Sequence, residues 1–109
     1  MPLRWNEQIK CIAAEHALQM AKGLMPFSHD GFDARVRRFP PNRAAGENLA
    51  MNGGVYDVAK CAVDGWINSP GHRKNLLGAF DVCGIGVARS GTGQFYLTQL
   101  FANTGTPFR

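Results

Sequence analysis

Three side chains that could do chemistry together are spread along the sequence: His29, Glu47 and His72. His29 follows a phenylalanine and a serine, Glu47 lies between a glycine and an asparagine, and His72 belongs to a Ser-Pro-Gly-His-Arg segment. Two imidazoles and one carboxylate, with one open position, are sufficient ligands for a catalytic zinc ion. We therefore expect the three side chains to meet at the edge of one cavity and to bind a divalent metal there.

Each of these residues also has a plainer interpretation, which the sequence alone leaves open. His29 could be a surface-loop histidine, and His72 could only brace the junction between two helices. Glu47 has small and apolar neighbours, so its carboxylate needs a cation, a metal or a proton, and one of the arginines could supply the charge. His16 falls in an apolar helical stripe, which favours a hydrogen-bonded core residue over a metal ligand.

Residues 6–22 have the periodicity of a helix with one apolar face. Asn6 can cap its first turn, and Gly23 follows at the position where helices often end. Its apolar stripe has the spacing i, i+3, i+4, i+7, i+8 and i+11: Ile9, Ile12, Ala13, His16, Ala17 and Met20.

Residues 55–69 predict a second helix, whose stripe should be core: Val55, Val58, Ala59, Ala62, Val63, Trp66 and Ile67. An Asn-Gly-Gly segment at 52–54 precedes it as a loop and cap. Pro70 ends this helix, because proline lacks a donor and clashes with the preceding turn. Ser69 and Pro70 then read as the N-cap and first residue of a short helix that stops at Gly78.

The last third of the chain predicts a β-hairpin. Residues 83–89 and 95–101 alternate between two kinds of side chain around a Ser-Gly-Thr-Gly turn at 90–93. Small residues on one face of the first strand indicate close packing against a helix. Residues 24–45 have no sustained period, and 46–50 read as a loop in which a glycine lets the backbone turn.

Composition limits the class of protein. The chain has 109 residues, 45% hydrophobic and 18% charged, which predicts one globular domain over residues 1–109. No apolar run is long enough to span a membrane, and the first residues do not resemble a signal peptide. The net charge is +4, but the basic run at 35–38 lacks interleaved aromatics. We read that run as a solvated loop and expect no nucleic-acid partner.

The cysteines are Cys11, Cys61 and Cys83, and no Cys-x-x-Cys motif is present. This excludes a zinc finger and a disulfide scaffold. A Cys61–Cys83 bridge is conceivable, but the scattered positions favour buried free thiols that pack as small hydrophobes.

Six short motifs together resemble the CAP superfamily of cysteine-rich secretory proteins, antigen 5 and pathogenesis-related 1, and the Ser-Pro-Gly-His-Arg form is similar to its microbial branch. The likeness runs from Leu3 to Phe101. In chain order the motifs are Phe27-Ser28-His29, Gly46-Glu47-Asn48-Leu49-Ala50, Ala62-Val63-x-x-Trp66, Ser69-Pro70-Gly71-His72-Arg73, Gly84-Ile85-Gly86-Val87-Ala88 and Tyr96-x-Thr98-Gln99-x-Phe101.

The resemblance implies an α+β fold, an α-β-α sandwich with a small antiparallel sheet between helices, in a secreted protein. It also implies a central cavity where two histidines and two glutamates bind a divalent metal, often Zn²⁺. His29 and Glu47 match the first of each pair. Ser69 and Tyr96 stand where the other two would be, so we expect His72 to fill the gap. The expected ligand-binding residues are Ser69, Tyr96 and Gln99.

For function, the resemblance implies a non-enzymatic binding domain whose partner is a lipid, a sterol-like molecule or a cell-surface component. The alternative is a zinc-dependent hydrolase, a protease or esterase that uses the same cavity. Ser69 lacks the Gly-x-Ser-x-Gly context of a serine nucleophile. Relatives also carry a helix before the segment that matches residues 2–5. Without it an apolar face would be open, which predicts a homodimer or reduced stability.

Overall fold

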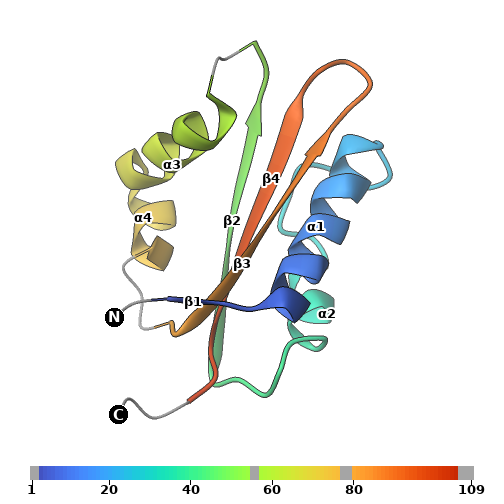
Figure 1. The fold of residues 1–109 in the computed structure, drawn as a ribbon. Helices are drawn as coiled ribbons and strands as arrows, with labels where there is room; N and C mark the ends of the chain where they lie inside the picture. The colour runs from blue at the N-terminus through green and yellow to red at the C-terminus, as the bar shows by residue number, and fades with distance from the viewer. Residues whose placement is uncertain (1–2, 55–56, 77–79, 106–109) are drawn as a thin grey trace.

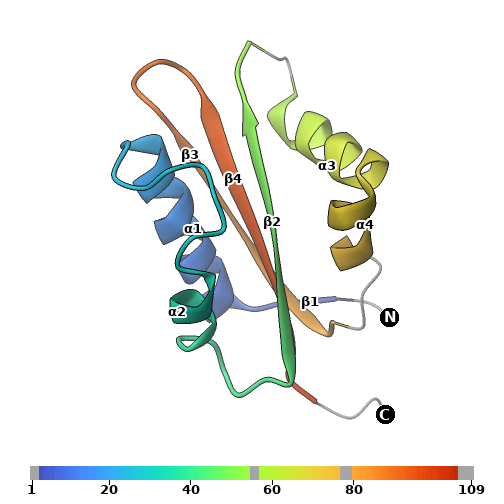
Figure 2. The same ribbon diagram turned by 180° about the vertical axis from the view of Figure 1, so that it is seen from behind.

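The computed structural model describes residues 3–54, 57–76 and 80–105. Two layers of helices cover a central sheet (Figures 1 and 2). Helices α1 (Glu7–Ala21) and α2 (Phe32–Val36) lie on one side of it. Helices α3 (Val58–Asn68) and α4 (Pro70–Leu76) lie on the other. The α-β-α sandwich expected from the sequence is confirmed.

The sheet has four strands in the order β1-β3-β4-β2. They are β1 (Arg4–Trp5), β2 (Ala44–Asn52), β3 (Val82–Arg89) and β4 (Phe95–Asn103). The predicted hairpin is β3–β4, and β4 pairs antiparallel with β2 as well. The expected antiparallel sheet is therefore confirmed for the three long strands, while the two-residue β1 adds a parallel pair with β3.

Helix α1 follows its sequence pattern closely. The Asn6 side chain accepts a hydrogen bond from the backbone N–H of Ile9, and all six residues of the predicted stripe are buried. The helix also packs unusually close to β3. A Cβ built on Gly86 would lie 2.2 Å from the Cα of Ala14, and one built on Gly84 would lie 2.3 Å from the backbone nitrogen of Lys10. Glycine is thus required for this helix–strand distance.

Helix α3 departs from its pattern. Ala62 and Trp66 are buried against Leu97 of β4, but Val63 is 42% exposed and Ile67 is 46% exposed. Of the predicted stripe residues that the structure describes, only Ala62 and Trp66 are therefore buried. The N-cap is also not the 52–54 loop. It is Asp57, whose side chain accepts from the backbone N–H of Lys60.

Three of the described elements were not predicted, namely the short strand β1 and the two elements that follow α1. Residues 44–52, read in part as a loop, form the nine-residue strand β2, and the irregular segment before them contains α2. The start of α4 at Pro70 is confirmed, and the backbone N–H of Arg73 donates to the carbonyl of Ser69. The proposed helix start at residue 55 and helix end at residue 78 lie outside the described residues.

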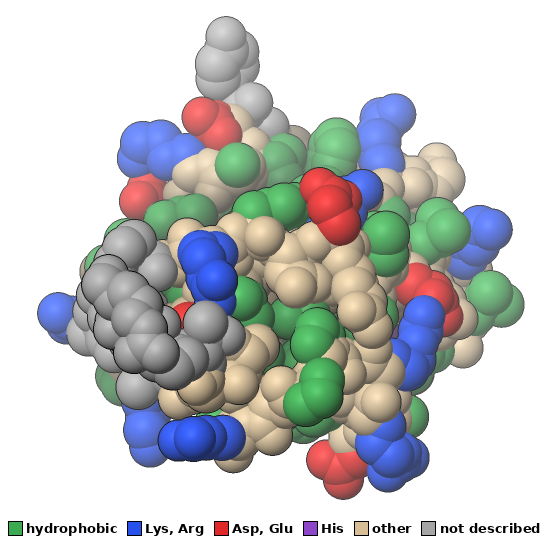
Figure 3. All heavy atoms as spheres, turned by 60° about the horizontal axis from the view of Figure 1, so that its bottom comes forward, with side chains coloured by type: hydrophobic (Ala, Val, Ile, Leu, Met, Phe, Trp, Pro, Cys, Tyr) green, Lys and Arg blue, Asp and Glu red, His purple; other side chains and the backbone are tan. Residues whose placement is uncertain are grey.

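All three cysteines are free. Cys83 is buried, and burial raises the pKa of its thiol. Cys11 is exposed, so the expected burial is wrong for that residue. Within the described ranges, no helix has the length and apolar character needed to cross a bilayer. Figure 3 shows one face of the molecule, where most of the Lys and Arg side chains lie around the rim and are not gathered into one patch.

Candidate functional site

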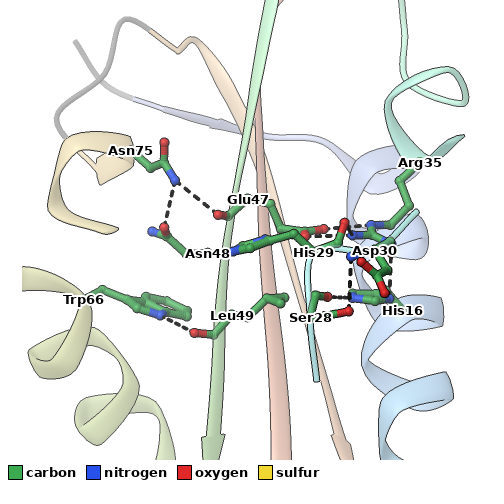
Figure 4. Close-up of polar contacts among 10 residues, drawn as sticks. All are labelled: His16, Ser28, His29, Asp30, Arg35, Glu47, Asn48, Leu49, Trp66 and Asn75. Atoms are coloured by element: carbon green, nitrogen blue, oxygen red, sulfur yellow. Dashed lines mark hydrogen bonds and ion pairs between the residues drawn. The ribbon is translucent and has the colours of Figure 1, made fainter. Parts of the chain in front are cut away.

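The carboxylate of Glu47 forms a buried ion pair with Arg35 (Figure 4). Arg35 Nε donates to Glu47 Oε2 and Nη2 donates to Oε1, both over 2.7 Å. Glu47 is 5% exposed and Arg35 is 6% exposed. The plainer interpretation of Glu47, pairing with an arginine, is therefore confirmed. The interpretation of residues 35–38 as a solvated loop is wrong for Arg35.

Arg35 also binds the segment before α2. Its Nη1 donates to the carbonyl of Asp30 over 2.7 Å, and its Nη2 donates to the carbonyl of His29 over 3.2 Å. Because Nη1 also contacts His16 Nδ1 at 3.3 Å, that imidazole nitrogen must be the acceptor. The other nitrogen, Nε2, then carries the proton and donates to the carbonyl of Ser28 over 3.1 Å.

His16 is therefore a neutral, hydrogen-bonded core residue, as the sequence predicted. It is 2% exposed. Burial, and then the positive charge of Arg35, lower the pKa of its imidazole. The side chain links α1 to the 28–30 segment and to the guanidinium.

His29 lies at the mouth of this cluster. Its Nδ1 is 2.8 Å from Glu47 Oε1, and its side chain is 57% exposed. Together with Phe32, Gly46 and Asn75 it lines a pocket of about 250 Å³. The pairing of His29 with Glu47, expected from the sequence, is therefore present.

The next residue of β2, Asn48, points to the opposite face of the sheet and is fully buried. Its Oδ1 accepts from Asn75 Nδ2 over 2.9 Å, and its Nδ2 donates to the carbonyl of His72 over 3.3 Å. Asn75 also donates to the carbonyl of Glu47, and Trp66 Nε1 donates to the carbonyl of Leu49 over 2.9 Å. Side chains of α3 and α4 thus hydrogen-bond to carbonyls of the edge strand β2.

His72 does not join His29 and Glu47. It lies in α4, on the side of the sheet that α3 covers, and its Nδ1 is 2.9 Å from Ser69 Oγ. Among the described residues, no group of three or more His, Cys, Asp and Glu side chains could hold a metal ion. Both oxygens of Glu47 are already bound by Arg35. The residues therefore do not form the three-ligand zinc centre that we expected, and the metal implied by the resemblance does not fit here.

The three expected ligand-binding residues are also separated. Tyr96 and Gln99 are three positions apart in β4, so their side chains point to opposite faces of the sheet. Tyr96 contacts the ring of Phe27, with centroids 6.2 Å apart. Gln99 is buried and accepts from Asn48 Nδ2 over 3.4 Å. Ser69 lines an open surface groove between α3 and β2.

That groove, which we call the α3–β2 groove, has a volume of about 240 Å³. Its middle is formed by small or apolar residues, and polar side chains lie at its ends. The Ser69–His72 pair marks one end, and Asn52, which accepts from Cys61 Sγ over 3.5 Å, marks the other. The lining residues are Leu49, Ala50, Met51, Asn52, Cys61, Ala62, Gly65, Trp66, Ser69 and His72.

Sequence reasoning missed Arg35, Asn48 and Asn75 as members of these sites. Because a buried glutamate needs a cation, an arginine partner could be inferred from the sequence. The sequence did not show which arginine it is. The two asparagines carried no signal of burial, since asparagine is mostly a surface residue.

Comparison with known proteins agrees with this fold. The family model described as "Cysteine-rich secretory protein family" (CAP) matches residues 1–101. A curated relative in Bacillus subtilis, "Uncharacterized membrane protein YlbC", is 47% identical over 58 residues, which are 52% of this chain and 14% of that protein. This chain therefore matches only about a seventh of that relative's length.

Two solved structures share the fold. An outer surface protein from Borrelia burgdorferi has a TM-score of 0.78 and 19% identity over 94% of this chain and 78% of that one. The structure "NaASP2 with Zn2+" has a TM-score of 0.58 and 14% identity over 91% of this chain and 58% of that one. The family model spans nearly the whole chain, and this protein therefore belongs to the cysteine-rich secretory protein (CAP) family.

Proposed function

We propose that this chain is an extracellular, non-enzymatic binding domain that holds a small single-chain lipid in the α3–β2 groove. The observation that carries the proposal is the groove itself. It joins an apolar floor to a polar end, where Ser69 Oγ and His72 Nδ1 lie 2.9 Å apart. Ligand sites are typically apolar clefts with a few polar groups that orient the ligand.

The lining of the groove suits an alkyl chain. Ala50, Ala62 and Gly65 leave a narrow path between β2 and α3. The groove volume, about 240 Å³, is below the roughly 300 Å³ where typical ligand pockets begin. A single alkyl chain therefore fits better than a fused-ring sterol.

The zinc-dependent hydrolase gains no support from the geometry. Catalytic zinc needs about three protein ligands and an open position. In the described part of the chain, His29 and Glu47 are adjacent but His72 is on the other side of the sheet. Zn²⁺ is present in the solved structure of NaASP2, whose 14% identity supports a shared fold only.

An extracellular location is supported by the family match and by the outer surface protein from Borrelia burgdorferi. The name of the Bacillus relative points to a membrane. Both fit a domain displayed outside the cell, either free or carried by a longer membrane protein.

The expected homodimer also remains a proposal. Trp5 and Val87 are each 52% exposed. The sheet register places their side chains on the face that carries α3, where Val63 and Ile67 are exposed too. A second copy that covers this face would bury apolar area. Analytical ultracentrifugation tests this proposal, which predicts that the wild type sediments as a dimer and Val87→Glu as a monomer. A monomeric wild type would refute it.

Trp66 makes lipid binding directly measurable, because its indole lines the groove. Bromine quenches tryptophan fluorescence at short range, so ω-bromododecanoic acid is a suitable probe. A Trp5→Phe background removes the other indole. A Cβ on Gly65 meets no atom within 4 Å, so Gly65→Leu should fill the groove without a clash. Gly71 of α4 also has open space and lies outside the groove lining, which makes Gly71→Leu the matched control.

The proposal predicts saturable quenching in the Trp5→Phe background and in its Gly71→Leu variant, with at least a tenfold loss of affinity in Gly65→Leu. Equal binding by the two leucine variants would place the lipid elsewhere. Quenching that never saturates would mean that no lipid site exists.

A further inference from the structure

The guanidinium of Arg35 is bound to both oxygens of Glu47, the carboxylate that a metal ion beside His29 would need. Arginine has five N–H donors in a fixed planar arrangement. The structure gives all five an acceptor: two Glu47 oxygens, the carbonyls of His29 and Asp30, and the Nδ1 of His16. These are the donor atoms, carboxylate, carbonyl and imidazole, that cations recruit in proteins.

The charges also balance without a metal. Glu47 carries the negative charge of the buried cluster and Arg35 carries the positive charge, while His16 is neutral. A divalent ion on Glu47 would have to displace the guanidinium, since both carboxylate oxygens are bound. Arg35 would then remain a buried cation without its partner, which is strongly unfavourable.

His29 cannot offset this on its own. Its Nδ1 faces Glu47 Oε1 at 2.8 Å, where the carboxylate can only accept, so that nitrogen carries a proton. Only the other imidazole nitrogen of His29, Nε2, is then available to bind a metal, and the His29 side chain is 57% exposed. A single imidazole is a weak site compared with the three or four ligands of natural zinc sites.

We propose that Arg35 is the built-in cation of this pocket, so that the pocket excludes divalent metals and holds α2 and the 28–30 segment on β2 without one. The guanidinium reaches β2 through Glu47, the 28–30 segment through two carbonyls, and α1 through His16. One side chain therefore ties four parts of the chain together. This inference does not depend on lipid binding in the α3–β2 groove, which involves none of these residues.

The test is calorimetric titration of Zn²⁺ into chelator-treated protein at neutral pH. We compare the wild type with Arg35→Met, which frees the Glu47 carboxylate. Arg37→Met is the matched control, because Arg37 follows α2 on the surface. The proposal predicts that Arg35→Met binds zinc at least tenfold tighter than the other two proteins. It also predicts that zinc in tenfold excess leaves the melting temperature of the wild type unchanged.

A second readout uses the wild type alone, in case Arg35→Met fails to fold. The Nε–H of Arg35 is buried and hydrogen-bonded, so its ¹⁵N–¹H NMR signal should be observable. The proposal predicts that this signal does not move when zinc is added. One-to-one zinc binding by the wild type that shifts the signal, and that His29→Ala abolishes, would overturn it.

Discussion

Replacement of Arg35 by methionine tests how much of the stability of the fold depends on the buried cluster. Methionine keeps most of the length of the side chain but removes the charge and all five donors. Glu47, whose side chain is 1% exposed, would then be a buried carboxylate with only the half-exposed His29 beside it. We expect a large loss of stability with the overall fold retained.

The magnitude follows from the burial of both partners. Removal of one member of a buried ion pair typically destabilises a protein by about 3–5 kcal/mol, because the other charge stays buried. Domains of this size are stable by roughly 5–15 kcal/mol. The melting temperature should therefore fall by on the order of 20 °C.

Urea unfolding at pH 7, followed by circular dichroism, measures this change. Arg37→Met is the control and should stay within about 0.5 kcal/mol of the wild type, as exposed sites usually do. A double variant, Arg35→Met with Glu47→Leu, should regain about half of the loss, because it removes the unpaired charge. A single Arg35→Met variant within about 1 kcal/mol of the wild type would refute the role given to this ion pair.

Three further predictions concern the packing around the sheet. In the folded protein the pKa of His16 lies below its ordinary value of 6.5, so the unfolded chain binds the proton more readily and stability should be full above pH 6.5 and fall on acidification toward pH 5. Urea unfolding midpoints measured across this pH range test the prediction. A His16→Gln variant with the same pH profile as the wild type would contradict it. Gly86→Ala would place a Cβ 2.2 Å from the Cα of Ala14 and should cost about 3 kcal/mol in urea unfolding, whereas a neutral result would mean that α1 can move away. Thr98 Oγ1 is buried with no hydrogen-bond partner in the described structure, so Thr98→Val should be neutral or stabilising by about 1 kcal/mol. A lower melting temperature of this variant would show that the hydroxyl is needed.

Helix α1 could be predicted because its apolar residues repeat with the period of a helix, and the β3–β4 hairpin because its side-chain types alternate on both sides of a glycine-rich turn. In α1 every stripe residue is buried, and in β3 the glycines alternate where the helix packs. Strand β2 has no such pattern. Its sequence is rich in Ala, Gly and Asn, which do not favour strands, and it is held by nine residue pairs with β4. Tertiary pairing decides its structure, and a single sequence does not display it.

The site was only partly predictable for a similar reason. Glu47 can be recognised from the sequence as a carboxylate that needs a partner, and the expectation that His29 lies beside it is correct. Its true counter-ion, Arg35, lies within a basic run that has the composition of a solvated loop. The sequence assigns His72 to the right helix but to the wrong group, because Glu47 and Asn48 are neighbours in one strand and point to opposite faces of the sheet.

A crystal structure of the wild type grown with ω-bromododecanoic acid tests the central claim most directly, because the anomalous signal of bromine gives the position of the bound chain. We predict a bromine peak in the α3–β2 groove, beside Trp66 and Ala62. A peak in the pocket of His29 and Glu47, or on the exposed face around Trp5 and Val87, would contradict the assignment of the groove as the binding site.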